Sequence, residues 1–280
     1  MSDQPATSGM QPKYYFLLRR LHSLSGIVPV GVFLIMHLFT NFQLVLGHED
    51  GPGVQFQHEV DFIHSLPALA IIEYTLWGSL LFHSVLGIYY TVQGSKSNLG
   101  AQPHKANYRY TLQRITGMIA LVFIFFHIAT LRWRWGFGGW FTPFYTHGVD
   151  NHGNEVLLAA ATTAKAIQHS TLVVLLYIVG SASVVYHWSN GLWTAAITWG
   201  ITISESAQKR WGQICAGMGV MLSIFFIGAL IGALTYDVTP QEEDAIKNKI
   251  KQAQQAPVKK QSASNQLPSS PTSLTGQRSQ

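Results

Sequence analysis

Five long apolar runs dominate this sequence, covering residues 26–46, 71–92, 115–131, 171–188 and 214–236. A run of about 20 residues with few charges is long enough to cross the hydrocarbon core of a bilayer as a helix. Of all residues, 48% are hydrophobic and only 11% are charged, which is too apolar for an ordinary soluble domain. The sequence therefore predicts an all-α integral membrane protein with five transmembrane helices.

Basic residues gather in alternate connections between the predicted helices. The connections before the first helix, before the third and before the fifth contain Lys13, Arg19, Arg20, Lys96, Lys105, Arg109, Arg114, Lys209 and Arg210. The other connections are rich in acidic residues. By the positive-inside rule we expect a cytoplasmic N-terminus and a C-terminus outside. The sequence pI of about 9.3 reflects this topology, so no nucleic-acid partner is implied.

Each of the first four predicted helices carries one histidine inside its apolar run, namely His37, His83, His127 and His187. Two local patterns repeat. In the segments 19–37 and 114–127, a basic residue, a small residue and a glycine precede the histidine by about three helical turns. In LFHSVLG and YHWSNGLW, a glycine follows the histidine by four residues. The chain therefore consists of a repeated pair of helices with one histidine each.

One intramembrane histidine is often a packing residue that is hydrogen-bonded to a neighbouring helix. Four histidines in paired contexts favour a metal-containing cofactor instead. Zinc would require tetrahedral clustering, whereas two imidazoles from different helices suit the axial positions of haem iron. The single cysteine, Cys215, allows neither an iron–sulfur cluster nor covalent haem attachment. The sequence therefore predicts two b-type haems.

Depth along the helices predicts which histidines share a haem. With a rise of 1.5 Å per residue, His37 and His127 lie about 16–18 Å from the inner boundary, His83 about 14 Å and His187 only a few Å. These levels pair His37 with His127 at an outer haem and His83 with His187 at an inner haem. Four glycines near these ligands either make room for a porphyrin or allow close helix packing: Gly26, Gly87, Gly117 and Gly191.

Haem propionates require cations and hydroxyl groups at the membrane surface. The candidates for the inner haem are Arg20, His22, Ser23 and Arg114, and those for the outer haem are Arg132 and Arg134. For every arginine, an interfacial anchor is the alternative role. We expect His22 to donate or accept a hydrogen bond at a propionate or a quinone, and not to bind iron.

Several segments resemble one known family, the cytochrome b membrane-anchor subunits of succinate:quinone oxidoreductases, in their single-chain, five-helix, two-haem type. They are RRLHSLSGIVPVGVFLIMHL (19–38), SLP with Glu73, HSVLGIY (83–89), LQRITG with His127, and HWSNGLWTAAITWGIT (187–202). The resemblance covers about residues 14–236. It implies that the four histidines bind the two haems of a succinate dehydrogenase or fumarate reductase in a bacterial cytoplasmic membrane.

The resemblance also implies partners and a substrate. A flavoprotein subunit would oxidise succinate, an iron–sulfur subunit would dock on the cytoplasmic loops, and menaquinone would accept the electrons. Glu73 matches a glutamate of the family and is the only carboxylate within the five predicted spans. It is therefore the candidate proton relay for quinone reduction. The alternative is that Glu73 is merely stabilised by the dipole near a helix N-terminus.

Outside the membrane domain at 13–238, we expect disordered tails at 1–12 and 239–280, because both are polar. The aromatic-rich connection at 133–169 is expected to lie on the outer surface as a lid or a partly buried segment, with a turn at its GFGG segment. Two other functions stay open at this point. One is a two-haem cytochrome b of a hydrogenase or formate dehydrogenase, and the other is a transporter that relays protons through its histidines.

Overall fold

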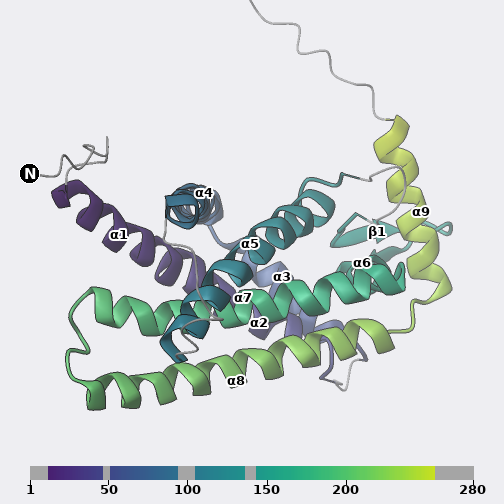
Figure 1. Ribbon diagram of the computed structural model, residues 1–280. Helices are drawn as coiled ribbons and strands as arrows, with labels where there is room; N and C mark the ends of the chain where they lie inside the picture. Colours follow the sequence, from purple (N-terminus) through teal and green to yellow (C-terminus); the bar gives the residue numbers. More distant parts are fainter. Residues whose placement is uncertain (1–11, 47–50, 94–104, 136–142, 256–280) are drawn as a thin grey trace, which may run out of the picture.

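The computed structural model describes residues 12–46, 51–93, 105–135 and 143–255 (Figure 1). Five helical segments in this part are long and apolar enough to cross a membrane, which confirms the predicted fold class. The first segment, Tyr14–Phe42, comprises α1 (Pro12–Ile27) and α2 (Pro29–Phe42). The others are α4 (Leu69–Gln93), Asn107–Leu131 within α5 (Lys105–Leu131), α7 (Thr171–Thr198) and α8 (Glu205–Thr235).

The first span is longer than the sequence predicted. The predicted apolar run begins at residue 26, but the helical segment that the structure shows begins in α1, which continues almost without interruption into α2. Val28 keeps helical dihedrals and its N–H donates to the carbonyl of Leu24, so only Pro29, which has no N–H, separates the two helices. Proline is tolerated at the first position of a helix because its missing donor would be unpaired there anyway.

Helix α7 lies at the centre of the bundle, with α5, α8 and α1 packed against it, while α2 packs along α8. Small residues allow these close contacts. A Cβ atom added at Gly180 of α7 would overlap the ring of Phe123 in α5, and one at Gly228 of α8 would overlap Phe42. In Figure 1, α7 and α8 run side by side across the view, whereas α4 is seen nearly end-on above them.

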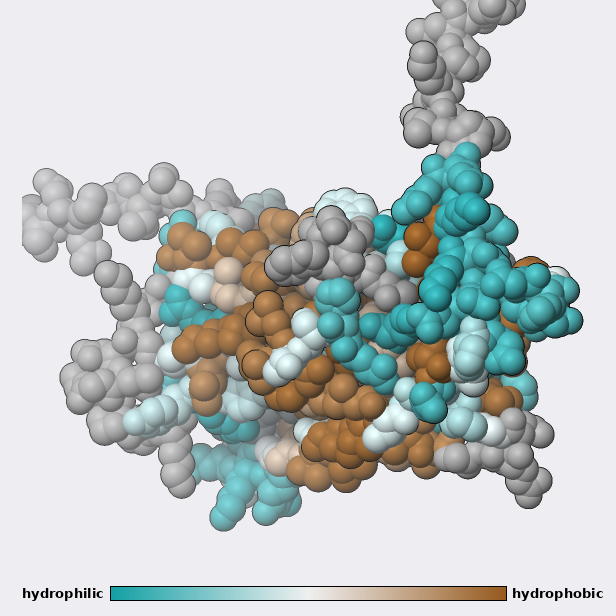
Figure 2. Space-filling view, turned by 90° about the vertical axis from the view of Figure 1, so that its right-hand side faces the viewer, coloured by the Kyte–Doolittle hydropathy of each residue, from teal (hydrophilic) through white to brown (hydrophobic). Residues whose placement is uncertain are grey.

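A layer outside the membrane spans covers the end where α2, α5 and α8 finish. It is built from α3 (Val54–Ser65), β1 (His147–Val149), β2 (Glu155–Leu157), α6 (Ala159–Gln168) and α9 (Pro240–Gln255), and we call it the outer cap. β1 and β2 pair antiparallel as a hairpin, the only sheet in the described part of the chain. Figure 2 faces this end and shows the hydrophilic surface of α9 beside the apolar surface of the spans.

Helix α9 corrects the prediction that the chain is disordered from residue 239. Ala245 and Ile246 are buried against the hairpin and α6, although the surrounding Gln and Lys residues conceal this apolar stripe. The helix begins with a capping box, in which the N–H of Thr239 donates to Glu242 Oε2 at 2.8 Å and the N–H of Glu242 donates to Thr239 Oγ1 at 3.3 Å. Residues 1–11 and 256–280 of the predicted tails lie outside the described residues.

Polar contacts join the cap to the spans and hold its turns. The Tyr236 hydroxyl, just after α8, donates to Glu242 at 2.7 Å, and burial together with this carboxylate raises the pKa of Tyr236. Between the two strands, the Asp150 carboxylate accepts hydrogen bonds from the Asn154 amide and from the backbone N–H groups of His152 and Asn154. These donors lower the pKa of Asp150. The GFGG segment lies outside the described residues.

Candidate functional site

Two histidines, one from the peripheral helix α4 and one from the central helix α7, meet near the end of the bundle where α5 begins. The rings of His83 in α4 and His187 in α7 lie 6.0 Å apart between centroids and at 90° to each other. His83 Nδ1 donates to the carbonyl of His22 at 2.9 Å, and His187 Nδ1 donates to the carbonyl of Gln113 at 3.0 Å. Because a carbonyl only accepts, Nδ1 carries the proton and Nε2 keeps the lone pair that binds a metal.

The same arrangement holds each of the two histidines: a backbone carbonyl and a glycine four residues after it, which we call the frame. The carbonyl that accepts from each ring lies four residues before a glycine, His22 before Gly26 and Gln113 before Gly117. A Cβ atom at Gly26 would lie 2.5 Å from His83 Cε1, and one at Gly117 would lie 2.7 Å from His187 Cε1. Gly26 and Gly117 therefore each make room for the imidazole of a neighbouring helix, which is a close helix contact, and a role beside a porphyrin stays a prediction.

The frames differ in one side chain. The His22 ring stacks on His83, with centroids 4.0 Å apart and planes at 11°. At the equivalent place the Gln113 amide donates to the carbonyl of His187 at 3.0 Å and accepts from Asn190 Nδ2 at 2.7 Å. The sequence analysis missed Gln113 and Asn190 as site residues. The repeated spacing to a glycine was the signal that could have identified Gln113.

The other two histidines form a second pair. The rings of His37 in α2 and His127 in α5 lie 5.7 Å apart at 80°. His127 Nδ1 is 3.1 Å from the hydroxyl of Tyr177, a residue that the sequence analysis did not select. Tyr177 and His187 are ten residues apart on α7, so the two pairs are separated by about 15 Å along this helix. The structure thus brings the four histidines together in the two predicted pairs.

The predicted propionate ligands lie beside the first pair, and most have protein partners. Ser23 Oγ donates to the carbonyl of Arg20 at 2.8 Å and accepts from Trp199 Nε1 at 2.9 Å. Arg114 donates to the carbonyl of Thr91, and so bridges α5 and α4. Within the described residues, Arg20 Nε and His22 Nδ1 are buried without a hydrogen-bond partner. These two buried atoms are therefore available to bind an anionic group.

Glu73 lies in the second turn of α4, at the end of the bundle that carries the outer cap. Arg132 Nη2 donates to both of its carboxylate oxygens, at 3.1 and 3.0 Å. Arg132 is therefore paired with Glu73, while Arg134 lies over the ring of Tyr145, 4.7 Å from its centroid. The fifth helical segment begins at Glu205, before the predicted run at 214–236, so this longer segment contains a second carboxylate in its first turn.

The donor set fits haem better than other metal groups. Among the described residues, no group of three or more His, Cys, Asp or Glu side chains could hold a metal ion, so a zinc site of that kind finds no support. Two imidazoles from different helices, each with its Nδ1 occupied, provide the pair of axial nitrogens that haem b requires. The buried atoms Arg20 Nε and His22 Nδ1 suit the carboxylates of such a group.

Comparison with known proteins gave one clear similarity. No family model matches the chain. Over 195 residues the chain is 35% identical to the succinate dehydrogenase cytochrome b558 subunit of Bacillus subtilis (strain 168). This alignment covers 69% of the present chain and 85% of that subunit.

Proposed function

This chain belongs to the cytochrome b subunits of succinate dehydrogenase, and we propose that it is a two-haem membrane anchor that passes electrons to menaquinone. Membership makes it a transmembrane electron-transport subunit that binds haem b and assembles with the other subunits of the complex. Membership of this family also argues against the two alternative functions, a cytochrome b of a hydrogenase or formate dehydrogenase and a transporter that relays protons. The number of haems, the quinone and the residue roles are the substance of the proposal.

The observation that carries the two-haem proposal is the double histidine pairing. His83 and His187 would bind the iron of the inner haem, and His37 and His127 that of the outer haem. When bound, each haem supplies an iron centre that takes up and releases one electron. The protein keeps the Nε2 lone pairs of His83 and His187 free by engaging Nδ1, and it spaces the two pairs along the membrane normal.

The polar residues near each pair then take their proposed roles. Arg20, His22, Ser23 and Arg114 would hold the propionates of the inner haem, with Arg20 Nε and His22 Nδ1 as the donors still available. The flavoprotein and iron–sulfur subunits would dock at the same end, where the basic residues place the cytoplasm. The N-terminus is then cytoplasmic and the C-terminus outside a bacterial cytoplasmic membrane.

Haem content tests the proposal most directly. The purified complex should give two haems per copy of this chain by pyridine haemochrome, and succinate should reduce at least one of them. His127→Leu removes an axial nitrogen that no neighbouring side chain replaces, so about one haem should be lost. Two fully occupied haems in this variant would refute the ligand set, and a wild-type content of one haem would refute the two-haem form.

Glu73 is the proposed proton relay for menaquinone at the outer end. Its carboxylate is partly exposed and is held by Arg132, which orients it without burying an unpaired charge. Glu73→Gln should lower succinate:quinone turnover by about 100-fold, since the amide cannot carry a proton. Haem content and succinate:dye activity should stay at wild-type values. Unchanged quinone turnover from pH 6 to 8 would leave Glu73 with a structural role only.

A further inference from the structure

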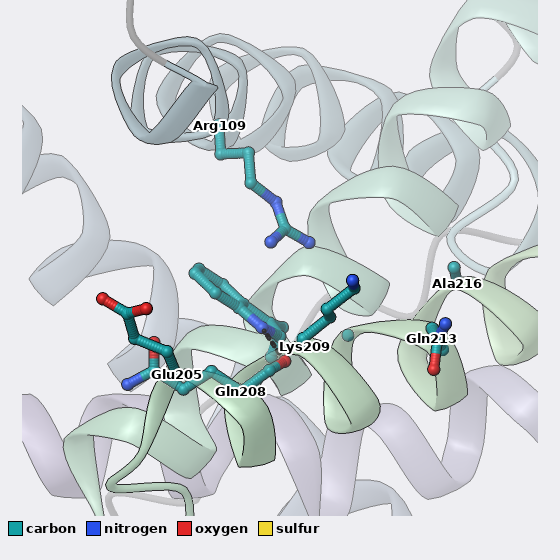
Figure 3. Close-up of a pocket in the computed structure, with 8 residues that line it drawn as sticks. Arg109, Glu205, Gln208, Lys209, Gln213 and Ala216 are labelled. Atoms are coloured by element: carbon teal, nitrogen blue, oxygen red, sulfur yellow. Dashed lines mark hydrogen bonds between the residues drawn. The ribbon is translucent and has the colours of Figure 1, made fainter.

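A cavity of about 420 Å³ opens between α5, α7 and α8 at the end of the bundle where α5 and α8 begin (Figure 3). It lies on the far side of α7 from α4, and none of its lining residues belongs to the proposed haem sites. Its walls include Arg109 of α5, Trp193 of α7, and Gln208, Lys209 and Gly212 of α8. Its volume falls within the range of small-ligand sites, which is roughly 300–1,000 Å³.

Arg109 is held in a fixed position at this cavity. Its guanidinium carbon lies 3.9 Å from the centroid of the Trp193 ring. The Trp193 ring is fixed in turn, because its Nε1 donates to the carbonyl of Gln208 at 3.0 Å. Stacking occupies one face of the guanidinium and leaves the N–H donors at its edge available for a planar or tetrahedral anion.

A second cation reaches the same space. Figure 3 shows the ammonium group of Lys209 and the guanidinium of Arg109 pointing into the cavity from two different helices. Glu205 also lines the cavity, but its carboxylate lies apart from both cations. Throughout the described ranges, no ion pair includes Arg109 or Lys209. Two cations without a carboxylate partner at a cavity favour an anionic ligand with oxygen acceptors.

The rest of the wall distinguishes a lipid from a soluble anion. Gly212, Gln213 and Ala216 continue the cavity along one face of α8, because Lys209, Gly212 or Gln213, and Ala216 follow one another at spacings of three or four residues. Gly212 lies against the Trp193 ring, and Ala216 follows it one turn further along α8. The same face continues into the membrane-spanning part of α8, where Val220, four residues after Ala216, is an exposed apolar side chain. A polar headgroup and an acyl chain would both have a matching surface.

We propose that this cavity binds the headgroup phosphate of an anionic phospholipid, with Arg109 and Lys209 as its ligands. Trp193 is a positioning residue that holds Arg109, and the acyl chains lie along Gly212 and Ala216. The basic end of the bundle faces the cytoplasm under the proposed orientation, where anionic lipids attract cationic side chains. The lipid would seal the contact of α8 with α5 and α7 at the membrane surface.

Lipid retention by the purified complex tests this site. In native mass spectrometry, added phosphatidylglycerol should remain bound to the wild-type complex in preference to phosphatidylcholine. The double variant Arg109→Gln/Lys209→Gln should reduce that binding by about tenfold or more. Arg210→Gln removes the same charge from the adjacent residue, which does not line the cavity, and should retain wild-type binding.

Three results would overturn the proposal. Equal binding of phosphatidylglycerol to the double variant and the Arg210→Gln control would show that the cavity is not the site. Displacement of the lipid by millimolar inorganic phosphate would identify a soluble anion site. Loss of the other subunits from the double variant, with lipid binding unchanged, would identify a protein docking site. Haem content measured on the same samples reports on the two-haem proposal separately, since no haem ligand is altered.

Discussion

Helices α4 and α7 carry the same motif, a histidine followed four residues later by a glycine, but they are packed very differently. Nine residues of α7 are buried, whereas none of the residues of α4 is. α7 contacts α5, α8 and α1, and α4 lies mainly against α1 and α2. The same local motif therefore serves a central scaffold helix in one half of the repeat and a peripheral helix in the other.

The contacts that hold α4 are few and specific. They are the His83 ring against Gly26, the Arg132–Glu73 ion pair, the stacking of Trp77 on Trp133, and the hydrogen bond from Arg114 to Thr91. In a membrane, helices associate by close packing and polar contacts, because lipid provides no hydrophobic driving force between them. A group bound at His83 would therefore contribute far more to the position of α4 than its equivalent does to α7.

Removal of the inner ligands should expose this difference most strongly. His83→Leu and His187→Leu should each eliminate the inner haem, and in both variants amide hydrogen exchange should accelerate in α4 by about tenfold or more, or ~1.4 kcal/mol. α7 should stay protected because its buried residues do not depend on the haem. Exchange is measured on the complex by mass spectrometry, segment by segment. Equal acceleration in α7 and α4 would remove the distinction between scaffold and peripheral helix.

Alanine at the two frame glycines should have the next largest effect. Gly26→Ala and Gly117→Ala place a methyl group within 2.7 Å of the ring of His83 or His187. Overpacking of this kind costs about 1–3 kcal/mol, so both variants should lose inner haem. Because α4 has no buried residues, it should move away from Gly26→Ala more readily than α7 moves away from Gly117→Ala. Gly78→Ala, in α4, is the matched control, because a Cβ atom at this position has nothing within 4 Å. Normal haem content in all three variants would show that neither frame positions its histidine.

The membrane spans and the histidine pairs were accessible from the sequence for definite physical reasons. A span must satisfy its backbone internally and keep about 20 apolar residues together, so its length and composition identify it. The fixed rise of a helix converts sequence position into depth, which placed His37 level with His127. The pairing of rings in the structure follows that prediction, while iron binding by them stays a prediction.

The cap and the supporting residues could not be predicted in the same way. Gln113 forms hydrogen bonds with His187 and Asn190, and the Tyr177 hydroxyl lies at hydrogen-bond distance from His127. All of these partners are 50 or more positions away in the sequence. The helix α9 depends on burial of Ala245 and Ile246 against the distant hairpin. Composition alone, rich in Gln and Lys, predicted a disordered tail there. Contacts that are long-range in sequence decide these features, and among them only Gln113 had a local signal, its spacing to Gly117.

His22 and Gln113, whose carbonyls accept from His83 and His187, give a finer test of the difference between α4 and α7. Gln113→Leu would leave the carbonyl of His187 and the amide of Asn190 without their partner, at a cost of about 1–3 kcal/mol. His22→Leu removes a stacking contact but retains the backbone carbonyl that His83 needs. We therefore expect a larger change in the inner-haem redox potential and electron paramagnetic resonance signal from Gln113→Leu than from His22→Leu. A Gln113→Glu variant, which preserves the shape and the acceptor, should be intermediate. The reverse order would mean that stacking on α4 outweighs hydrogen bonding on α7.

A substitution in the outer cap should have the smallest effect. This effect should be limited to the half of the repeat that contains α7. Asn154 and two backbone N–H groups lower the pKa of Asp150. Its stabilising contribution is therefore fully present above the unfolded pKa of about 3.9 and is lost as the pH falls through the lower folded value. Asp150→Ala should make the hairpin and the first turn of α7 more susceptible to proteolysis at pH 7, with α4 unchanged. As the pH falls below the unfolded pKa, the wild type should approach the variant, because protonation removes the same interaction. If the two proteins differ by a constant amount from pH 7 to pH 3, the Asp150 carboxylate does not stabilise the cap through its charge.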